Sequence, residues 1–121
     1  MSGKRLRPPR YMVHWKARVL TPDKKIYPGL IKEIMRTGFN LEFHQALPLD
    51  STLNIEFTFK YRGEAVKVRA RTNVEYCLIL ANNGGVEIDL SINTIASEHQ
   101  HILNNVMQTF ANASNINLRT E

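Results

Sequence analysis

The sequence predicts an all-β fold: a six-stranded antiparallel barrel followed by one C-terminal α-helix. Between residues 12 and 90, apolar and polar residues alternate in short runs separated by turn-forming residues, which is the pattern of half-buried strands. Beyond residue 90 the apolar residues recur at helical spacing instead. Closing the strands into a barrel removes exposed sheet edges, and the helix is expected to cover an open end.

Size and composition indicate one domain. The chain has 121 residues, of which 43% are hydrophobic, so it is large enough for one core. Cys77 is the single cysteine, which excludes an internal disulfide. No apolar run approaches the roughly 20 residues that span a membrane, and no apolar segment of a signal peptide follows the basic start. We therefore expect a soluble cytoplasmic protein with a flexible arm at residues 1–10, a barrel with its helix at 11–110 and a polar tail at 111–121.

Positive charge is concentrated at the amino end. Residues 1–22 hold six of the 16 Lys and Arg residues and no acid, whereas the remaining 10 basic residues face 11 acidic ones. Four of the six cations fall within the arm, which Pro8 and Pro9 stiffen in an extended form. A basic arm on a near-neutral body predicts an anionic partner. The alternative is a solvated, disordered chain end.

The first three strands are expected over residues 12–20, 26–34 and 39–43. In the first, the odd-numbered residues from 13 to 19 are apolar and face the core, with Trp15 among them. In the second, Pro28 and Gly29 predict a bulge or an edge. The break before the third strand ends in Gly38, a residue type that takes positive φ without steric cost, so a tight turn is expected there.

The other strands are expected over residues 53–61, 66–80 and 86–90. Phe57 and Phe59 alternate in phase with the aliphatic residues of their strand and are assigned to the core. Residues 62–64 predict a tight hairpin. The long return strand is expected to contain a bulge near Cys77, which is interpreted as a small core residue.

The helix is predicted from one apolar stripe. Asn93 or Ser97 is its candidate N-cap, and Ser97 with Gln100 fits a capping box. From Ala111 onward the chain is rich in asparagine and is expected to fray. The stripe consists of Ile95, Ile102, Leu103, Val106 and Phe110.

This order of elements resembles the PilZ domain, a bacterial receptor domain for cyclic diguanylate (c-di-GMP), over roughly residues 5–110. The family has an Arg-x-x-x-Arg motif on the arm and an Asp/Asn-x-Ser-x-x-Gly motif on the turn between strands two and three. Arg10 occupies the place of the second arginine, while Leu6 replaces the first and is flanked by Arg5 and Arg7. In the turn, Gly38 matches the family pattern.

Two positions of the turn motif depart from the family pattern. Glu33 replaces Asp/Asn, and its carboxylate can still accept hydrogen bonds from guanine. Met35 replaces Ser and loses a hydroxyl, which is worth about tenfold in affinity. Arginine can fork onto a phosphate or guanine and stack on a base, and Arg36 adds a cation. The ligand-binding residues that the resemblance implies are Arg5, Arg7, Arg10, Glu33, Met35, Arg36 and Gly38.

The leading functional hypothesis is a c-di-GMP receptor that signals by rearranging the arm, in a setting such as motility or biofilm control. The alternative is a degenerate PilZ-like domain that binds a protein partner, for instance in type IV pilus function. A remote alternative is a small barrel that binds single-stranded nucleic acid through the arm and the basic residues of strands four and five, but its aromatics are assigned to the core. A monomer and a homodimer both remain open.

The residues do not predict an enzyme, a metal site or a cofactor. His99 and His101 lie two apart on a helix and do not share a face. His14 falls on the polar side of a strand, and His44 lies alone in a loop. No phosphate-binding glycine loop or metal-ligand spacing is present in the sequence.

Overall fold

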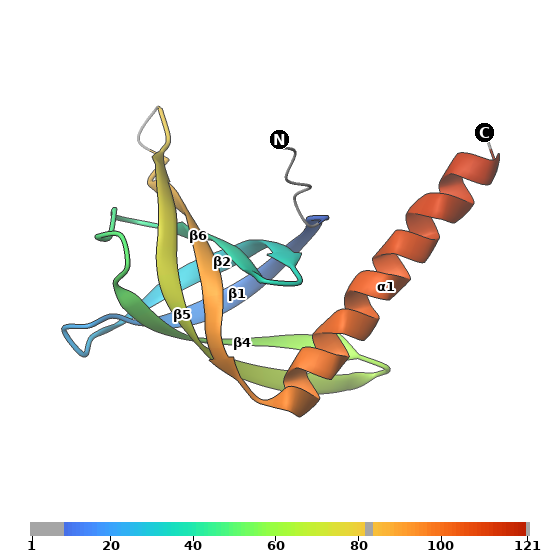
Figure 1. The fold of residues 1–121 in the computed structure, drawn as a ribbon, viewed down its shortest axis with the longest axis horizontal. Helices are drawn as coiled ribbons and strands as arrows, with labels where there is room; N and C mark the ends of the chain where they lie inside the picture. Colours follow the sequence, from blue (N-terminus) through green and yellow to red (C-terminus); the bar gives the residue numbers. More distant parts are fainter. Residues whose placement is uncertain (1–8, 82–83, 121) are drawn as a thin grey trace, which may run out of the picture.

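The part of the chain that the structure describes forms a closed β-barrel followed by one helix, as the sequence predicts (Figure 1). The structure, a computed structural model, describes residues 9–81 and 84–120, with side chains to residue 113. Around the barrel the antiparallel strands follow the order β1-β2-β3-β6-β5-β4. The elements are β1 (Tyr11–Leu20), β2 (Ile26–Met35), β3 (Gly38–Phe43), β4 (Thr52–Tyr61), β5 (Glu64–Ile79), β6 (Val86–Ile95) and α1 (Ser97–Thr120).

Two ladders between strands that are distant in sequence close the barrel. Hairpins join neighbouring strands, such as β1 with β2 and β4 with β5. The first closing ladder joins β1 to β4, with Ala17 opposite Phe57. The second joins β3 to β6, with Gly38 opposite Ser91. Residues that alternate along the sequence therefore point alternately into the barrel and outward.

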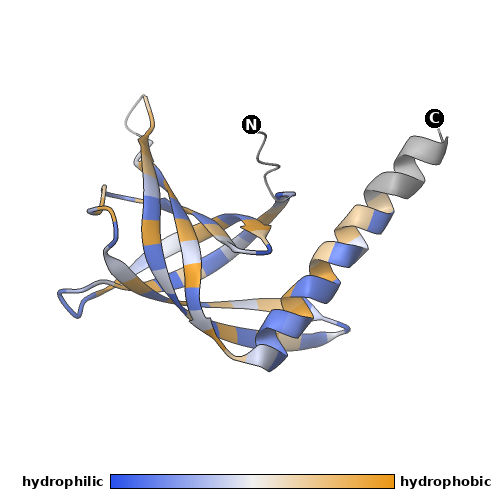
Figure 2. Ribbon diagram, viewed as in Figure 1, coloured by the Kyte–Doolittle hydropathy of each residue, from blue (hydrophilic) through white to orange (hydrophobic). Residues whose placement is uncertain are grey.

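The barrel interior is filled by the apolar residues that the alternation predicts. Figure 2 shows this alternation as hydrophobic and hydrophilic bands along the strands. The Trp15 ring stacks on Phe59 with 4.4 Å between ring centroids and on Phe57 with 5.6 Å. The largest fully buried side chains are Phe39, Phe57, Ile31, Ile34, Leu41, Leu53, Ile55, Ile88, Leu103, Val19, Val68 and Val74.

Two predictions, one about a hairpin loop and one about a proline in a strand, are confirmed in detail. Arg62 and Gly63 form a two-residue loop with φ values of 52° and 82°, which matches the right-handed twist of the flanking strands. Pro28 pairs with β1, but the β2–β3 ladder begins only at Leu30, so the proline lies where β2 has one neighbour.

The predicted boundary between the last strand and the helix is wrong. β6 continues to Ile95, because Arg71 pairs with Thr94 and Ala70 with Ile95 along β5. Ile95 therefore belongs to the sheet and not to the helical stripe, and Asn93 is no helix cap. A ladder with a long partner strand overrides the local pattern here.

The predicted helix end is also wrong, because α1 continues past Phe110 to Thr120. Its barrel-facing side buries Leu103 and Met107 and brings Phe110 within 6.1 Å of Tyr11, measured between ring centroids. Asn105 donates a hydrogen bond of 3.1 Å to the Tyr61 hydroxyl. The helix is thus fixed to the beginning of β1 and the end of β4.

Candidate functional site

Gly38 is required for close packing between strands. The prediction that it takes positive φ in a turn is wrong, because its φ lies outside the left-handed region that Gly63 and Gly85 occupy. Gly38 begins β3, and a Cβ atom at this position would overlap the carbonyl oxygen of Leu90 on β6. Only glycine lets the two backbones approach so closely.

The arm and the strand before the turn meet at Arg10. Its Nη1 atom lies 2.9 Å from Oε1 of Glu33, so the end of the arm contacts the first position of the turn motif. The same guanidinium forks onto Asp89 of β6, with Nη1 3.3 Å from Oδ1 and Nη2 3.1 Å from Oδ2. One arginine therefore bridges two carboxylates on different strands, in the bidentate geometry that guanidinium favours.

The carboxylate of Asp89 also accepts a hydrogen bond from the neighbouring strand β3. Asn40 on β3 donates from Nδ2 to Asp89 Oδ1 at 3.0 Å. The Asn40 side chain is buried, and the sheet register places Glu33, Asn40 and Asp89 in one row across β2, β3 and β6. This row gives the site a rigid base beneath the end of the arm.

Asn40 and Asp89 are members of this cluster that the sequence did not predict. Asp89 alternates with Ile88 and Leu90 just as Glu87 alternates with Val86 and Ile88, so the sequence of the strand contains no signal that singles out Asp89. Only the ladder between β3 and β6 brings it to Asn40.

The two carboxylates stabilise the charged form of Arg10 further. Hydrogen bonds to Asp89 and then to Glu33 raise the pKa of Arg10 above its ordinary value, against the opposing effect of burial. An incoming anion or guanine edge must therefore compete with two carboxylates for the guanidinium. A ligand that displaces these carboxylates from Arg10 leaves Glu33 and Asp89 able to accept hydrogen bonds from it. The cluster can therefore exchange its internal ion pairs for contacts with a ligand.

The other predicted residues have different environments. Met35 is buried, with 8% of its surface exposed, so its side chain faces away from solvent. Arg36 is exposed in the turn and lines a cavity of about 260 Å³ that is shared with Pro9, Tyr11 and helix α1. Arg5 and Arg7 lie outside the described residues. The structure thus places Arg10 with Glu33, while Arg36 lines a separate cavity beside Pro9, Tyr11 and helix α1.

We expect replacement of Asp89 by alanine to destabilise the fold by about 1–3 kcal/mol, because the buried Asn40 amide and the Arg10 guanidinium both lose an acceptor. Urea unfolding measures this loss. Glu33→Ala is the comparison, because Arg10 keeps its fork on Asp89, and a loss below about 1 kcal/mol is expected. Equal losses in the two variants would contradict the central role of Asp89.

The described residues contain no helix that is long and apolar enough to cross a membrane. Within the same residues, no three His, Cys, Asp or Glu side chains are grouped to hold a metal ion.

The closed six-stranded barrel, with a helix after the last strand and an arm that meets the β2–β3 region, is a PilZ-like fold. This conclusion rests on similar solved structures. The first is the Bacillus subtilis inhibitor of motility MotI/DgrA, with a TM-score of 0.76 and 12% identity over 90% of this chain and 53% of that protein. The second is MrkH of K. pneumonia in complex with c-di-GMP, with a TM-score of 0.67 and 15% identity over 93% of this chain and 56% of that protein.

The chain spans about half the length of these two proteins. No family model matches its sequence, and no curated protein sequence matches it. At 12% and 15% identity the structural likeness establishes the fold.

Proposed function

We propose that the protein is a c-di-GMP receptor that binds the dinucleotide between the arm and the β2–β3 turn. The observation that carries this proposal is the contact between Arg10 and Glu33, which brings the two motif-bearing segments together. The likeness to the MrkH–c-di-GMP complex supports it, because that protein with the same fold holds this ligand. The protein acts by binding, as a cytoplasmic receptor and not as an enzyme.

Binding proceeds by exchange of partners at Arg10. The guanidinium leaves Asp89 and Glu33 for a phosphate or for O6 and N7 of guanine, which it can fork onto in the same way. The carboxylates then accept hydrogen bonds from the ring NH and amino group of guanine. Arg5 and Arg7 add charge along the arm, and Arg36 adds a cation from the turn. Nucleotide binding thereby rearranges the arm, and this rearrangement is the signalling change.

The experiment is a calorimetric titration of c-di-GMP into the purified protein. We expect binding at micromolar concentration or tighter, and loss of at least about tenfold in affinity for Arg10→Ala, because charged hydrogen bonds are removed. Arg62→Ala is the matched control, because Arg62 is an exposed arginine in the β4–β5 turn. Unchanged affinity in Arg10→Ala, or equal loss in the two variants, would exclude the proposed site.

The second candidate is a PilZ-like interaction module without nucleotide. The burial of Met35 favours it, because the family's serine position holds an apolar side chain that faces the interior. Absence of heat with the natural protein would support this candidate. Restored binding in Met35→Ser with Glu33→Asp would then show that the nucleotide site is present but eroded by these two residues.

A further inference from the structure

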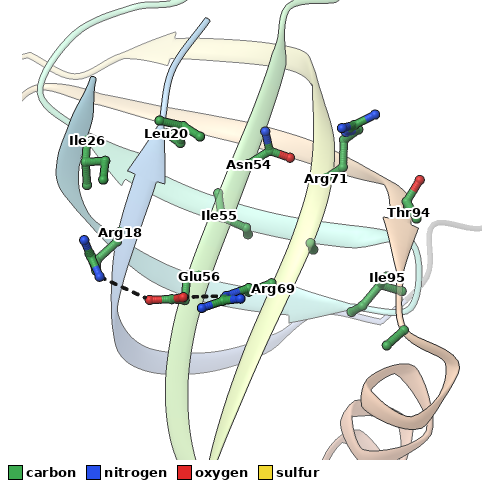
Figure 3. A pocket seen from close by; sticks show the side chains of 12 residues that line it. Arg18, Leu20, Ile26, Asn54, Ile55, Glu56, Arg69, Arg71, Thr94 and Ile95 are labelled. Carbon is green, nitrogen blue, oxygen red and sulfur yellow. Dashed lines mark hydrogen bonds and ion pairs between the residues drawn. The ribbon is translucent and has the colours of Figure 1, made fainter. Parts of the chain in front are cut away.

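A groove on the outer face of the barrel, distinct from the Arg10 cluster, combines exposed arginines with aliphatic residues (Figure 3). Its volume is about 680 Å³, and its walls come from β1, β4, β5, the first residue of β2 and the end of β6. We call it the arginine groove. The cations that line it are Arg18, Arg69 and Arg71.

Glu56 fixes two of these arginines in place. It lies 2.7 Å from Arg69 Nε and 3.5 Å from Arg18 Nη1. The hydrogen bond from Arg69, followed by the nearby charges of Lys67 and Arg18, lowers the pKa of Glu56 and keeps it ionised. The Glu56 side chain is 18% exposed, against 66% for Arg18 and 76% for Arg69, so the carboxylate lies beneath the guanidinium groups that solvent reaches.

The groove has more positive charge than Glu56 can balance. Arg69 uses only its Nε for the bond to Glu56, so its two Nη groups keep their donors for a ligand. Within the part of the chain that the structure describes, Arg71 makes no hydrogen bond or ion pair. Two arginines of β5 thus present forked donors toward an anionic ligand.

Aliphatic side chains lie at both ends of this charged centre. Leu20 pairs with Ile26 on one side, and Ile95 lies on the other (Figure 3). Ala96, the next residue in the chain, also lines the groove. Ile26 is 56% exposed, which is high for an isoleucine in a strand. Across the strands, the surface of the groove therefore changes from aliphatic to basic and back to aliphatic.

This order favours a protein segment as the ligand. Single-stranded nucleic acid needs aromatic side chains on which bases stack, and no aromatic residue is among the described residues that line the groove. From β1 to β6 the groove crosses three strand spacings, about 14 Å, which an extended segment of about five residues spans. Carboxylates of such a segment can pair with the arginines, and its aliphatic side chains can pack against the two ends of the groove.

We propose that the arginine groove binds a short extended segment of a partner protein that has an acidic centre flanked on both sides by aliphatic residues. The segment crosses the strands from β1 to β6, with its carboxylates on Arg69 and Arg71 and its aliphatic ends against Leu20 and Ile95. This surface is separate from the nucleotide site, so the domain can carry both ligands.

The test measures fluorescence anisotropy of a labelled, end-capped peptide, Leu-Glu-Glu-Glu-Leu, with the full chain. We expect saturable binding that weakens at least about tenfold in the Arg69→Gln/Arg71→Gln variant, because two charged hydrogen-bonding groups are lost. Both residues are exposed, so the variant is expected to fold, and circular dichroism checks this. Arg62→Gln removes one charge from the β4–β5 turn, outside the groove, and is expected to leave peptide affinity unchanged.

Two altered peptides and one oligonucleotide complete the design. Leu-Gln-Gln-Gln-Leu tests the charge, Ser-Glu-Glu-Glu-Ser tests the aliphatic ends, and both are expected to bind at least about fivefold more weakly. A labelled single-stranded oligothymidine tests the rival ligand. Equal binding of all three peptides, equal loss in Arg62→Gln, no peptide binding at all, or tighter binding of the oligonucleotide through the same arginines would each overturn the proposal.

Discussion

Replacing Gly38 by alanine is expected to destabilise the protein by about 3 kcal/mol or more, or to prevent folding. The added Cβ would overlap the Leu90 carbonyl oxygen, which belongs to a backbone and cannot rotate away. Relief requires β3 and β6 to separate at the position where Gly38 pairs with Ser91. Thermal unfolding of the purified variant, or its recovery in the soluble fraction, measures the effect.

Gly84→Ala is the matched control for this prediction. A Cβ at Gly84 would meet Leu80 side-chain atoms at 3.6 Å, an ordinary van der Waals distance. We expect a change of less than about 1 kcal/mol. If Gly38→Ala unfolds at the temperature of the natural protein, the close approach of β3 and β6 is not as tight as the structure places it.

Replacing Phe57 by alanine is expected to cost about 3–5 kcal/mol, the usual range for removal of a buried phenylalanine. Phe57 is 2% exposed and lies in an aromatic cluster, with its ring centroid 5.4 Å from Phe39 and 5.6 Å from Trp15. Its loss leaves a cavity in the centre of the barrel. Because Trp15 is the single tryptophan, its fluorescence in denaturant reports unfolding directly.

Phe57→Leu separates packing volume from the aromatic contacts. It keeps most of the apolar surface, so a loss of about 1–1.5 kcal/mol is expected. A loss below 1 kcal/mol for Phe57→Ala would show that the barrel interior collapses around the site. In that case Trp15 would move into the space that Phe57 leaves, and its fluorescence emission would shift in the folded variant.

The barrel could be predicted because its strands are amphipathic. Phe57 and Phe59 have one polar neighbour on each side, which fixes both the strand and its buried face. The end of β6 could not be predicted in this way. Ile95 fits the helical stripe, and only its pairing with Ala70 of β5 assigns it to the sheet.

The site was predicted in part for a similar reason. Glu33 and Arg10 belong to segments that the resemblance to PilZ domains identifies. Asp89 lies outside both segments, 49 residues from Asn40 and 79 from Arg10 in the sequence. Neither local pattern nor motif spacing encodes the ladder that brings Asp89 to Asn40. The sequence predicts a glycine-dependent turn at Gly38, but the backbone that leaves no room for a Cβ atom there belongs to a distant strand.

The two closing ladders also determine how the chain folds. The hairpins β1–β2 and β4–β5 form from residues close in sequence, but β3 must find β6 across the whole β4–β5 hairpin. The entropy of closing this long loop is lost before the β3–β6 contacts compensate for it. Such non-local topology places folding in the range of about milliseconds to seconds, slower than for helical domains of similar size. The Arg10–Asp89 fork depends on that late ladder, so the candidate site is complete only when the barrel has closed.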